Sequence, residues 1–127
     1  MWTRSTDEVL KHRLIDIIAV DRERMIVLFR FGGTPRIVTA AIWKNGDRFS
    51  IDVSHTFKPP EHAAGYFPVN RRRSTSAEAL QDLVSTWSQM LSCAVEDGQK
   101  PHSIWFVRNK HWCVDKYCKI APAAKSR

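Results

Sequence analysis

The stretch RIVTAAIWKNGDRFSIDVS, residues 36–54, decides the fold class of this chain. Its first part is rich in β-branched residues, which pack well on sheets, and its last part alternates polar and apolar residues. Between them, Asn45-Gly46 is a strong hairpin signal, because a type I′ turn needs positive φ at both central residues. The stretch therefore predicts two antiparallel strands, over residues 36–43 and 48–54. In the second strand the alternation divides the side chains into a buried set (Phe49, Ile51, Val53) and an outward set (Arg48, Ser50, Asp52, Ser54).

Residues upstream of this hairpin extend the predicted sheet. Residues 24–31 form a clear strand pattern that Gly32-Gly33 and Pro35 end. Residues 6–20 are ambiguous, since the leucines and isoleucines have helical spacing but a β-branched run covers 14–20. We favour a short helical turn with Ser5 as N-cap, followed by a strand over about 13–20; a single helix over 6–20 is the alternative. Three or four strands would then form an antiparallel meander.

The downstream half contains the best helix signal. Thr75 and Glu78 form a capping box, and Gly98 is a plausible stop. Apolar residues follow at helical spacing, so one helix face should cover the sheet: Leu80, Leu83, Val84, Trp87, Leu91, Ala94 and Val95. Residues 56–74 contain prolines and should form a loop, attached to the body by Phe57, Tyr66 and Phe67. Residues 102–108 resemble one more strand.

These patterns predict a single α+β domain over residues 1–120 and a flexible basic tail over 121–127. Its architecture would be an antiparallel β-meander of three to five strands packed against one long amphipathic helix. The 127 residues are 43% hydrophobic, which is enough for a core. No signal peptide or membrane-length apolar run is present, and an odd number of cysteines, three, argues against a disulfide framework. We therefore expect a cytoplasmic protein without membrane contact.

The formal net charge of +7 is unevenly distributed. Residues 75–98 hold no Lys or Arg and four acids, whereas residues 99–127 hold seven Lys or Arg and one acid, a net of +6. Residues 56–74 add a net of +3 from four basic residues and one acid. Such concentration of positive charge favours an anionic partner.

Three groups of residues are candidates for binding that partner. Arg71-Arg72-Arg73 precede the helix start, where hydroxyls and backbone N–H groups can hold a phosphate. Arg36 and Arg48 are interleaved with aromatic residues on the predicted sheet, a mixture that suits single strands on an open sheet face. The segment from Asn109 to Lys119 adds Lys110, Trp112, Lys116 and Lys119. In that segment we expect Trp112 or Tyr117, with one cysteine, to face inward.

The sequence thus predicts a non-enzymatic binding protein, with single-stranded or structured nucleic acid as the first partner. The alternative is a small adaptor or inhibitor that docks on an acidic protein surface or in the nucleic-acid groove of a larger machine. The long helix carries no Lys or Arg, so it is not a recognition helix for a DNA groove. An exposed edge strand at 48–54 or 102–108 could also pair two chains.

Signals for metal or catalysis are weak. Cys113 and Cys118 have C-x4-C spacing near His111, which is loose for zinc, and Cys93 is expected at the border of the buried helix face. No C-x-x-C or nucleotide-binding motif is present. Ser54-His55 and His102-Ser103 are sequence neighbours, whose side chains would point to opposite faces of a strand. We therefore predict no catalytic residues, no metal site and no cofactor.

Overall fold

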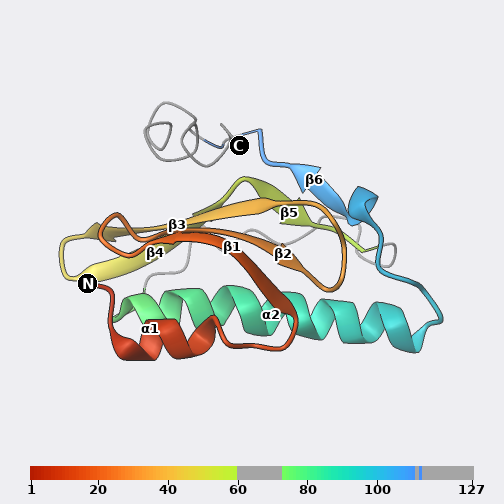
Figure 1. The fold of residues 1–127 in the computed structure, drawn as a ribbon, viewed down its shortest axis with the longest axis horizontal. Coiled ribbons are helices and arrows are strands. Elements are labelled where there is room, and N and C mark those ends of the chain that lie inside the picture. The colour runs from red at the N-terminus through yellow and green to blue at the C-terminus, as the bar shows by residue number, and fades with distance from the viewer. Residues whose placement is uncertain (60–72, 111, 113–127) are drawn as a thin grey trace.

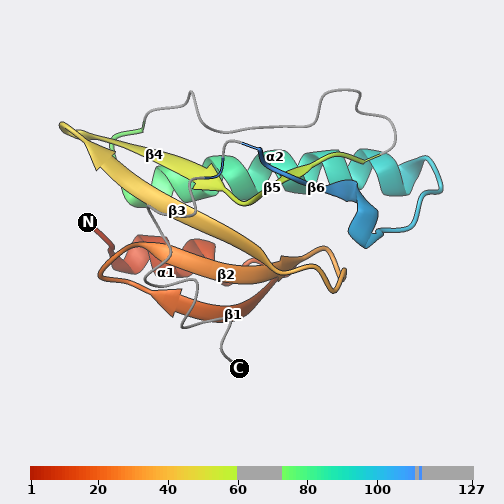
Figure 2. The same cartoon turned by 90° about the horizontal axis from the view of Figure 1, so that it is seen from above.

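The computed structural model describes residues 1–59, 73–110 and 112. Its elements follow one another along the chain as α1 (Arg4–Val9), β1 (Ile15–Asp21), β2 (Ile26–Phe31), β3 (Val38–Asn45), β4 (Arg48–Val53), β5 (His55–Phe57), α2 (Ser76–Glu96), the 3₁₀ turn η1 (Ser103–Trp105) and β6 (Phe106–Arg108). Strands β1 to β4 form an antiparallel sheet in sequential order, and β5 pairs with β6. Helix α2 runs along one face of this sheet with α1 beside it (Figure 1), and the view from above shows β1 to β4 in sequential order (Figure 2). The predicted α+β class, with a meander against one long helix, is confirmed.

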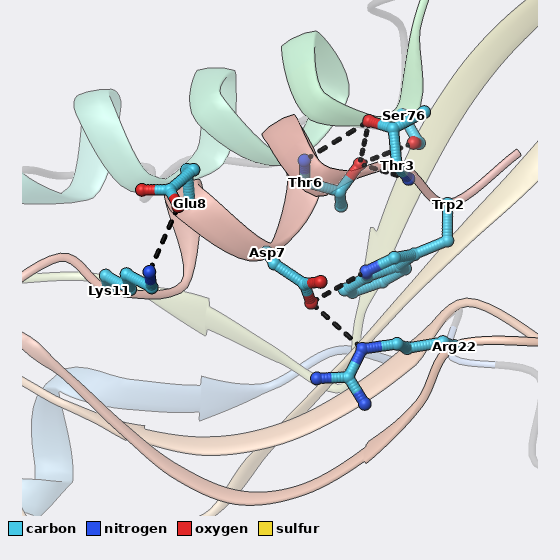
Figure 3. Close-up of polar contacts among 8 residues, drawn as sticks. All are labelled: Trp2, Thr3, Thr6, Asp7, Glu8, Lys11, Arg22 and Ser76. Carbon is cyan, nitrogen blue, oxygen red and sulfur yellow. Dashed lines mark hydrogen bonds and ion pairs between the residues drawn. The ribbon is translucent and has the colours of Figure 1, made fainter.

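The N-terminal ambiguity resolves as a short helix followed by a strand, so the single helix over 6–20 is wrong. The N-cap is Thr3 rather than Ser5, and Thr3 and Thr6 form the capping box. Helix α1 joins the first turn of α2 through a buried hydrogen bond between the Thr6 and Ser76 hydroxyls, at 2.8 Å (Figure 3). Asp7 accepts hydrogen bonds from Trp2 Nε1 and Arg22 Nε, each at 2.9 Å (Figure 3). These two donors lower the pKa of the Asp7 carboxyl, with Trp2 the larger cause.

The β3–β4 hairpin forms as predicted, but its turn lies one residue later. Asn45 pairs with Arg48, so the two-residue loop is Gly46-Asp47 and Gly46 takes a positive φ of 67°. At the β2–β3 connection Gly32 also has positive φ, and a Cβ there would lie 3.2 Å from Leu91 Cδ2. That glycine therefore permits both the turn and the close approach of α2.

Helix α2 begins and ends where the sequence indicates. The Thr75–Glu78 capping box is present. At the other end, N–H groups of Gly98 and Gln99 donate to the carbonyls of Val95 and Ala94, at 2.9 and 3.0 Å, which is a Schellman motif. Two assignments on the helix face were wrong: Val95 is 49% exposed and Cys93 is exposed. The buried stripe contains Leu91 and Ala94, as predicted, and also Met90, which we did not assign to it.

Trp87 is the centre of the core. Its ring lies 5.5 Å from the ring of Phe31, between centroids, and 6.2 Å from that of Phe29. It lies equally close to the second sheet, 5.5 Å from Phe57 and 5.7 Å from Phe106. One α2 side chain therefore contacts both sheets, which also meet directly where the rings of Phe31 and Phe57 lie 5.6 Å apart.

The second sheet replaces part of a predicted loop and part of a predicted strand. Residues 55–57 form β5, although we expected a loop from residue 56. The strand expected over 102–108 is shortened to β6, because His102 accepts a hydrogen bond from the Ile104 N–H and caps a 3₁₀ turn. Phe57 is buried as expected, whereas Tyr66 and Phe67 lie outside the described residues.

The face of the large sheet turned away from α2 is also apolar at its centre. Ile26, Leu28 and Ala41 are buried there, and Trp112 packs against them. Ser50, which the alternation assigned to the outward set, is only 3% exposed, whereas Phe49, Ile51 and Val53 are buried as predicted. The centre of this face is therefore not the open basic and aromatic surface that we expected.

The edges of the large sheet are less suited to pairing with a second chain than we expected from the sequence. The outer edge of β4 is bridged at Phe49 by the backbone of Arg73, and the Asn109 N–H donates to the Ser54 carbonyl just beyond the strand. The opposite edge is β1, which has an irregularity between Ile17 and Ala19 that discourages regular pairing. Within the part of the chain that the structure describes, no helix combines the length and apolar character needed to cross a membrane.

Replacing Trp87 tests whether the two sheets depend on one contact. We expect Trp87→Ala to lower the free energy of unfolding by about 3–5 kcal/mol, because it empties the centre of the core. Ile104→Ala, at a site that is 71% exposed, is the control and should change it by at most about 0.5 kcal/mol. Urea denaturation followed by circular dichroism measures both. A loss near that of the control would contradict the central role of Trp87.

Candidate functional site

The structure divides the predicted binding residues into two groups at opposite ends of β4. Arg48 and Arg73 lie at the start of the strand, next to the first turn of α2. Arg36, Lys110 and Trp112 belong to the segments at the other end, near β5 and β6. The five steps from the first to the last residue of β4, at roughly 3.3 Å each, put these ends about 17 Å apart. Arg71, Arg72, Lys116 and Lys119 lie outside the described residues.

At the α2 corner, the chain's own carboxylates accept hydrogen bonds from the described donors that we expected to hold an anion. Arg73 donates to both oxygens of Asp82, at 2.6 and 2.8 Å. Glu78 Oε1 accepts the backbone N–H groups of Ser74 and Thr75, at 3.1 and 3.2 Å. A bidentate pair and a capping carboxylate satisfy donors that a phosphate would otherwise use. Arg48 is exposed and lies 3.4 Å from the Ser74 hydroxyl.

At the other end of β4, buried Asn109 fixes the segment that follows β6. Its backbone N–H donates to the Ser54 carbonyl at 2.9 Å, and its side-chain Nδ2 donates to the Val53 carbonyl at 2.8 Å. Its own carbonyl accepts the Trp112 N–H at 3.1 Å, which turns the chain toward the outer face of the sheet. As expected, Trp112 is partly buried and Lys110 is exposed.

The chain bends at Ser54, between β4 and β5, and this bend places the side chains of Ser54 and His55 next to each other. The Ser54 Oγ accepts the Thr39 N–H at 2.8 Å, while the Ser54 N–H donates to the Thr39 carbonyl at the same distance. His55 Nδ1 lies 2.8 Å from the same Ser54 Oγ. The expectation that these neighbours point to opposite faces was wrong, because the alternation rule holds only within a regular strand.

Two arginines from distant segments act on His55. Arg108 pairs with it across β5 and β6, and paired residues lie side by side on one face. Arg36 reaches it from the connection between β2 and β3. Burial, first, and then the positive charges of Arg36 and Arg108 lower the pKa of the His55 imidazole. The ring is therefore neutral at neutral pH.

We define the β5–β6 basic surface as Arg36, His55, Arg108 and Lys110. Among the described residues, no carboxylate lies within 4.0 Å of the two arginines or of Lys110. This surface differs from the α2 corner, where Asp82 neutralises Arg73. Sequence reasoning identified Arg36 and Lys110 but missed His55 and Arg108. The pairing of His55 with Arg108 spans 53 positions along the chain (108 minus 55), and no local pattern shows it.

The geometry offers little for catalysis or for a metal in the described region. The Ser54 oxygen already accepts a backbone N–H, and no described carboxylate orients His55 as a catalytic base would require. No three His, Cys, Asp or Glu side chains gather as metal ligands within residues 1–59, 73–110 and 112. His111, Cys113 and Cys118, the loose zinc candidates, lie outside those residues. What the site offers is cations and hydrogen-bond donors for an anion.

The lowered pKa of His55 predicts how stability depends on pH. Between the folded-state pKa and the ordinary value of about 6.5, the unfolded chain binds more protons, so the free energy of unfolding falls as the pH falls. Urea denaturation between about pH 7.5 and about pH 5 should show this decline, above the range in which Asp7 titrates. In His55→Gln the decline should be smaller, and in His102→Asn, which keeps an N-cap acceptor, it should match the wild type. Equal slopes in wild type and His55→Gln would refute this assignment.

The chain matches no family model, no curated protein and no solved structure.

Proposed function

We propose that this protein is a non-enzymatic binding protein that holds single-stranded or structured nucleic acid on the β5–β6 basic surface. The supporting observation is that Arg36, from the β2–β3 connection, and Arg108 and Lys110, from the end of β6 and just after it, lie at one end of β4 without a described carboxylate beside them. Guanidinium groups match the geometry of phosphate oxygens, and unneutralised cations displace the counterions of a nucleic-acid backbone.

Hydrogen bonds hold one part of the β5–β6 basic surface in position. Asn109 ties the segment that bears Arg108 and Lys110 to the end of β4 through two hydrogen bonds. Positions that are held before binding cost less entropy on binding. Trp112, two residues beyond Lys110, is partly buried against Ile26, Leu28 and Ala41 on the outer face of the sheet, and its ring is of the kind that stacks on bases.

Salt dependence and charge reversal test this proposal together. We expect a fluorescent thymidine oligonucleotide to bind with an affinity that falls with salt, with a log–log slope of about −2 for three single-strand phosphate contacts. The triple variant Arg36→Glu, Arg108→Glu, Lys110→Glu should lose at least about tenfold in affinity at low salt. Fluorescence anisotropy measures both quantities.

A matched control separates location from net charge. Arg4→Glu, Arg13→Glu and Arg24→Glu change the net charge by the same amount at exposed positions elsewhere. This control should bind the oligonucleotide more tightly than the triple variant of the β5–β6 basic surface. Equal losses of affinity in both variants would show that the interaction depends on net charge alone. Arg71→Glu with Arg72→Glu tests the basic run that precedes α2 in the sequence, and a loss of affinity confined to that variant would contradict binding at the β5–β6 basic surface.

A second candidate is docking on an acidic protein surface. Ile104 and Val107, on either side of the start of β6, are 71% and 46% exposed, and apolar side chains beside cations are typical of protein interfaces. A polyglutamate peptide is the appropriate probe. Binding to this peptide, without binding to any oligonucleotide at low salt, would favour the protein partner over nucleic acid.

A further inference from the structure

We propose that Arg36, His55 and Arg108 form a phosphate subsite in which His55 takes up a proton as the phosphate binds. This inference rests on the proposed function and adds a ligand class and a pH dependence to it. The geometry is a histidine at the start of β5, placed beside Arg108 by strand pairing and in the field of Arg36 from the β2–β3 connection. A phosphate among these groups would meet two fixed cations and one ring that can become a third.

The hydroxyl of Ser54 gives this protonation a structural consequence. A hydroxyl has one hydrogen to donate and two lone pairs to accept with, and the Thr39 N–H uses one lone pair at 2.8 Å. While His55 is neutral with Nδ1 as acceptor, the Ser54 hydrogen is directed at Nδ1, 2.8 Å away. When Nδ1 is protonated it becomes the donor and takes the second lone pair. The Ser54 hydrogen is then released and can be donated to a ligand.

The charges around His55 explain why the proton arrives only with the ligand. In the free protein, burial and the two arginines favour the neutral ring. A phosphate between the arginines leaves the burial of the ring in place, but it opposes their field and its own negative charge attracts a protonated ring. Because linkage is reciprocal, a ligand that favours the protonated ring binds more tightly at lower pH. One pKa unit of coupling corresponds to about tenfold in affinity.

Two other charged groups lie on the neighbouring elements, and neither is among the causes of the shift in the His55 pKa. On β4, Asp52 is held by its own neighbours: its Oδ1 accepts the Val53 N–H at 3.0 Å and lies 3.5 Å from Asn109 Nδ2. On the turn after β6, Lys110 adds a further positive charge. Among the described groups, those that shift His55 are therefore the arginines on the two elements that flank it, one on the β2–β3 connection and one on β6.

The pH dependence of binding tests the proposal with the full chain. A thymidine oligonucleotide without terminal phosphates is the probe, because neither its bases nor its phosphodiesters titrate in the relevant range. At constant ionic strength, wild-type affinity should rise about tenfold between about pH 7.5 and about pH 5.5. His55→Gln should show no such rise, and His102→Asn, a matched histidine control, should follow the wild type.

An NMR titration of His55 provides a second readout that does not depend on nucleic acid. Saturating inorganic phosphate should raise the pKa of His55, and Arg36→Gln with Arg108→Gln should abolish that rise. Oligonucleotide binding with the same pH dependence in wild type and His55→Gln would overturn the proton-linked subsite while leaving the proposed function intact. Absence of oligonucleotide binding at every pH would overturn the proposed function. The subsite would then survive only if inorganic phosphate still raised the pKa of His55.

Discussion

The packing of Trp87 is the contact on which the rest of the structure depends. Its ring touches aromatic residues of both sheets, so one α2 side chain packs against the meander and against β5 and β6 at once. Its indole Nε1 is buried without a hydrogen-bond partner in the described part of the chain, which costs about 1–3 kcal/mol. Burying an aromatic ring of about 150–250 Å² contributes about 4–6 kcal/mol, so packing outweighs the lost hydrogen bond.

The proposed site follows from how the chain leaves the meander. After β4 the backbone bends at Ser54, whose hydroxyl accepts a hydrogen bond from the backbone of β3. The next residues therefore pair with β6 and not with β3. Asn109 then fastens the end of β6 to the end of β4. These hydrogen bonds place residues from the β2–β3 connection, β5 and β6 at one end of β4. The β5–β6 basic surface is the consequence of that junction.

Several elements were predictable because their causes are local. The Thr75–Glu78 capping box, the Gly98 stop and the alternation of Phe49, Ile51 and Val53 each depend on residues a few positions apart. The 3₁₀ turn at 103–105 is also local, since His102 caps it, but it interrupts a strand-like sequence. Other predictions failed because they concern contacts over long separations: the partner of β5 lies about 50 residues away. The burial of Ser50 and the neutralisation of Arg73 by Asp82 likewise depend on tertiary neighbours.

The site was predictable only in part for the same reason. Net charge by segment pointed to the C-terminal quarter, which contains Arg108 and Lys110, but it also favoured Arg73, whose charge Asp82 neutralises. The histidine between two arginines could not be anticipated, because its neighbours come from residues 36 and 108. A basic residue in a sequence therefore indicates an anion site only when its carboxylate neighbours in space are also known.

The central claim is that nucleic acid contacts the end of β4 where β5 and β6 meet. Chemical-shift mapping by NMR, with a thymidine oligonucleotide added to the isotope-labelled full chain, tests it most directly. The account predicts that the largest shifts fall on Arg36, His55, Arg108 and Lys110, while Arg48 and Ser74 at the α2 corner change little. Shifts concentrated at that corner or along α2, with the β5–β6 basic surface unchanged, would contradict it.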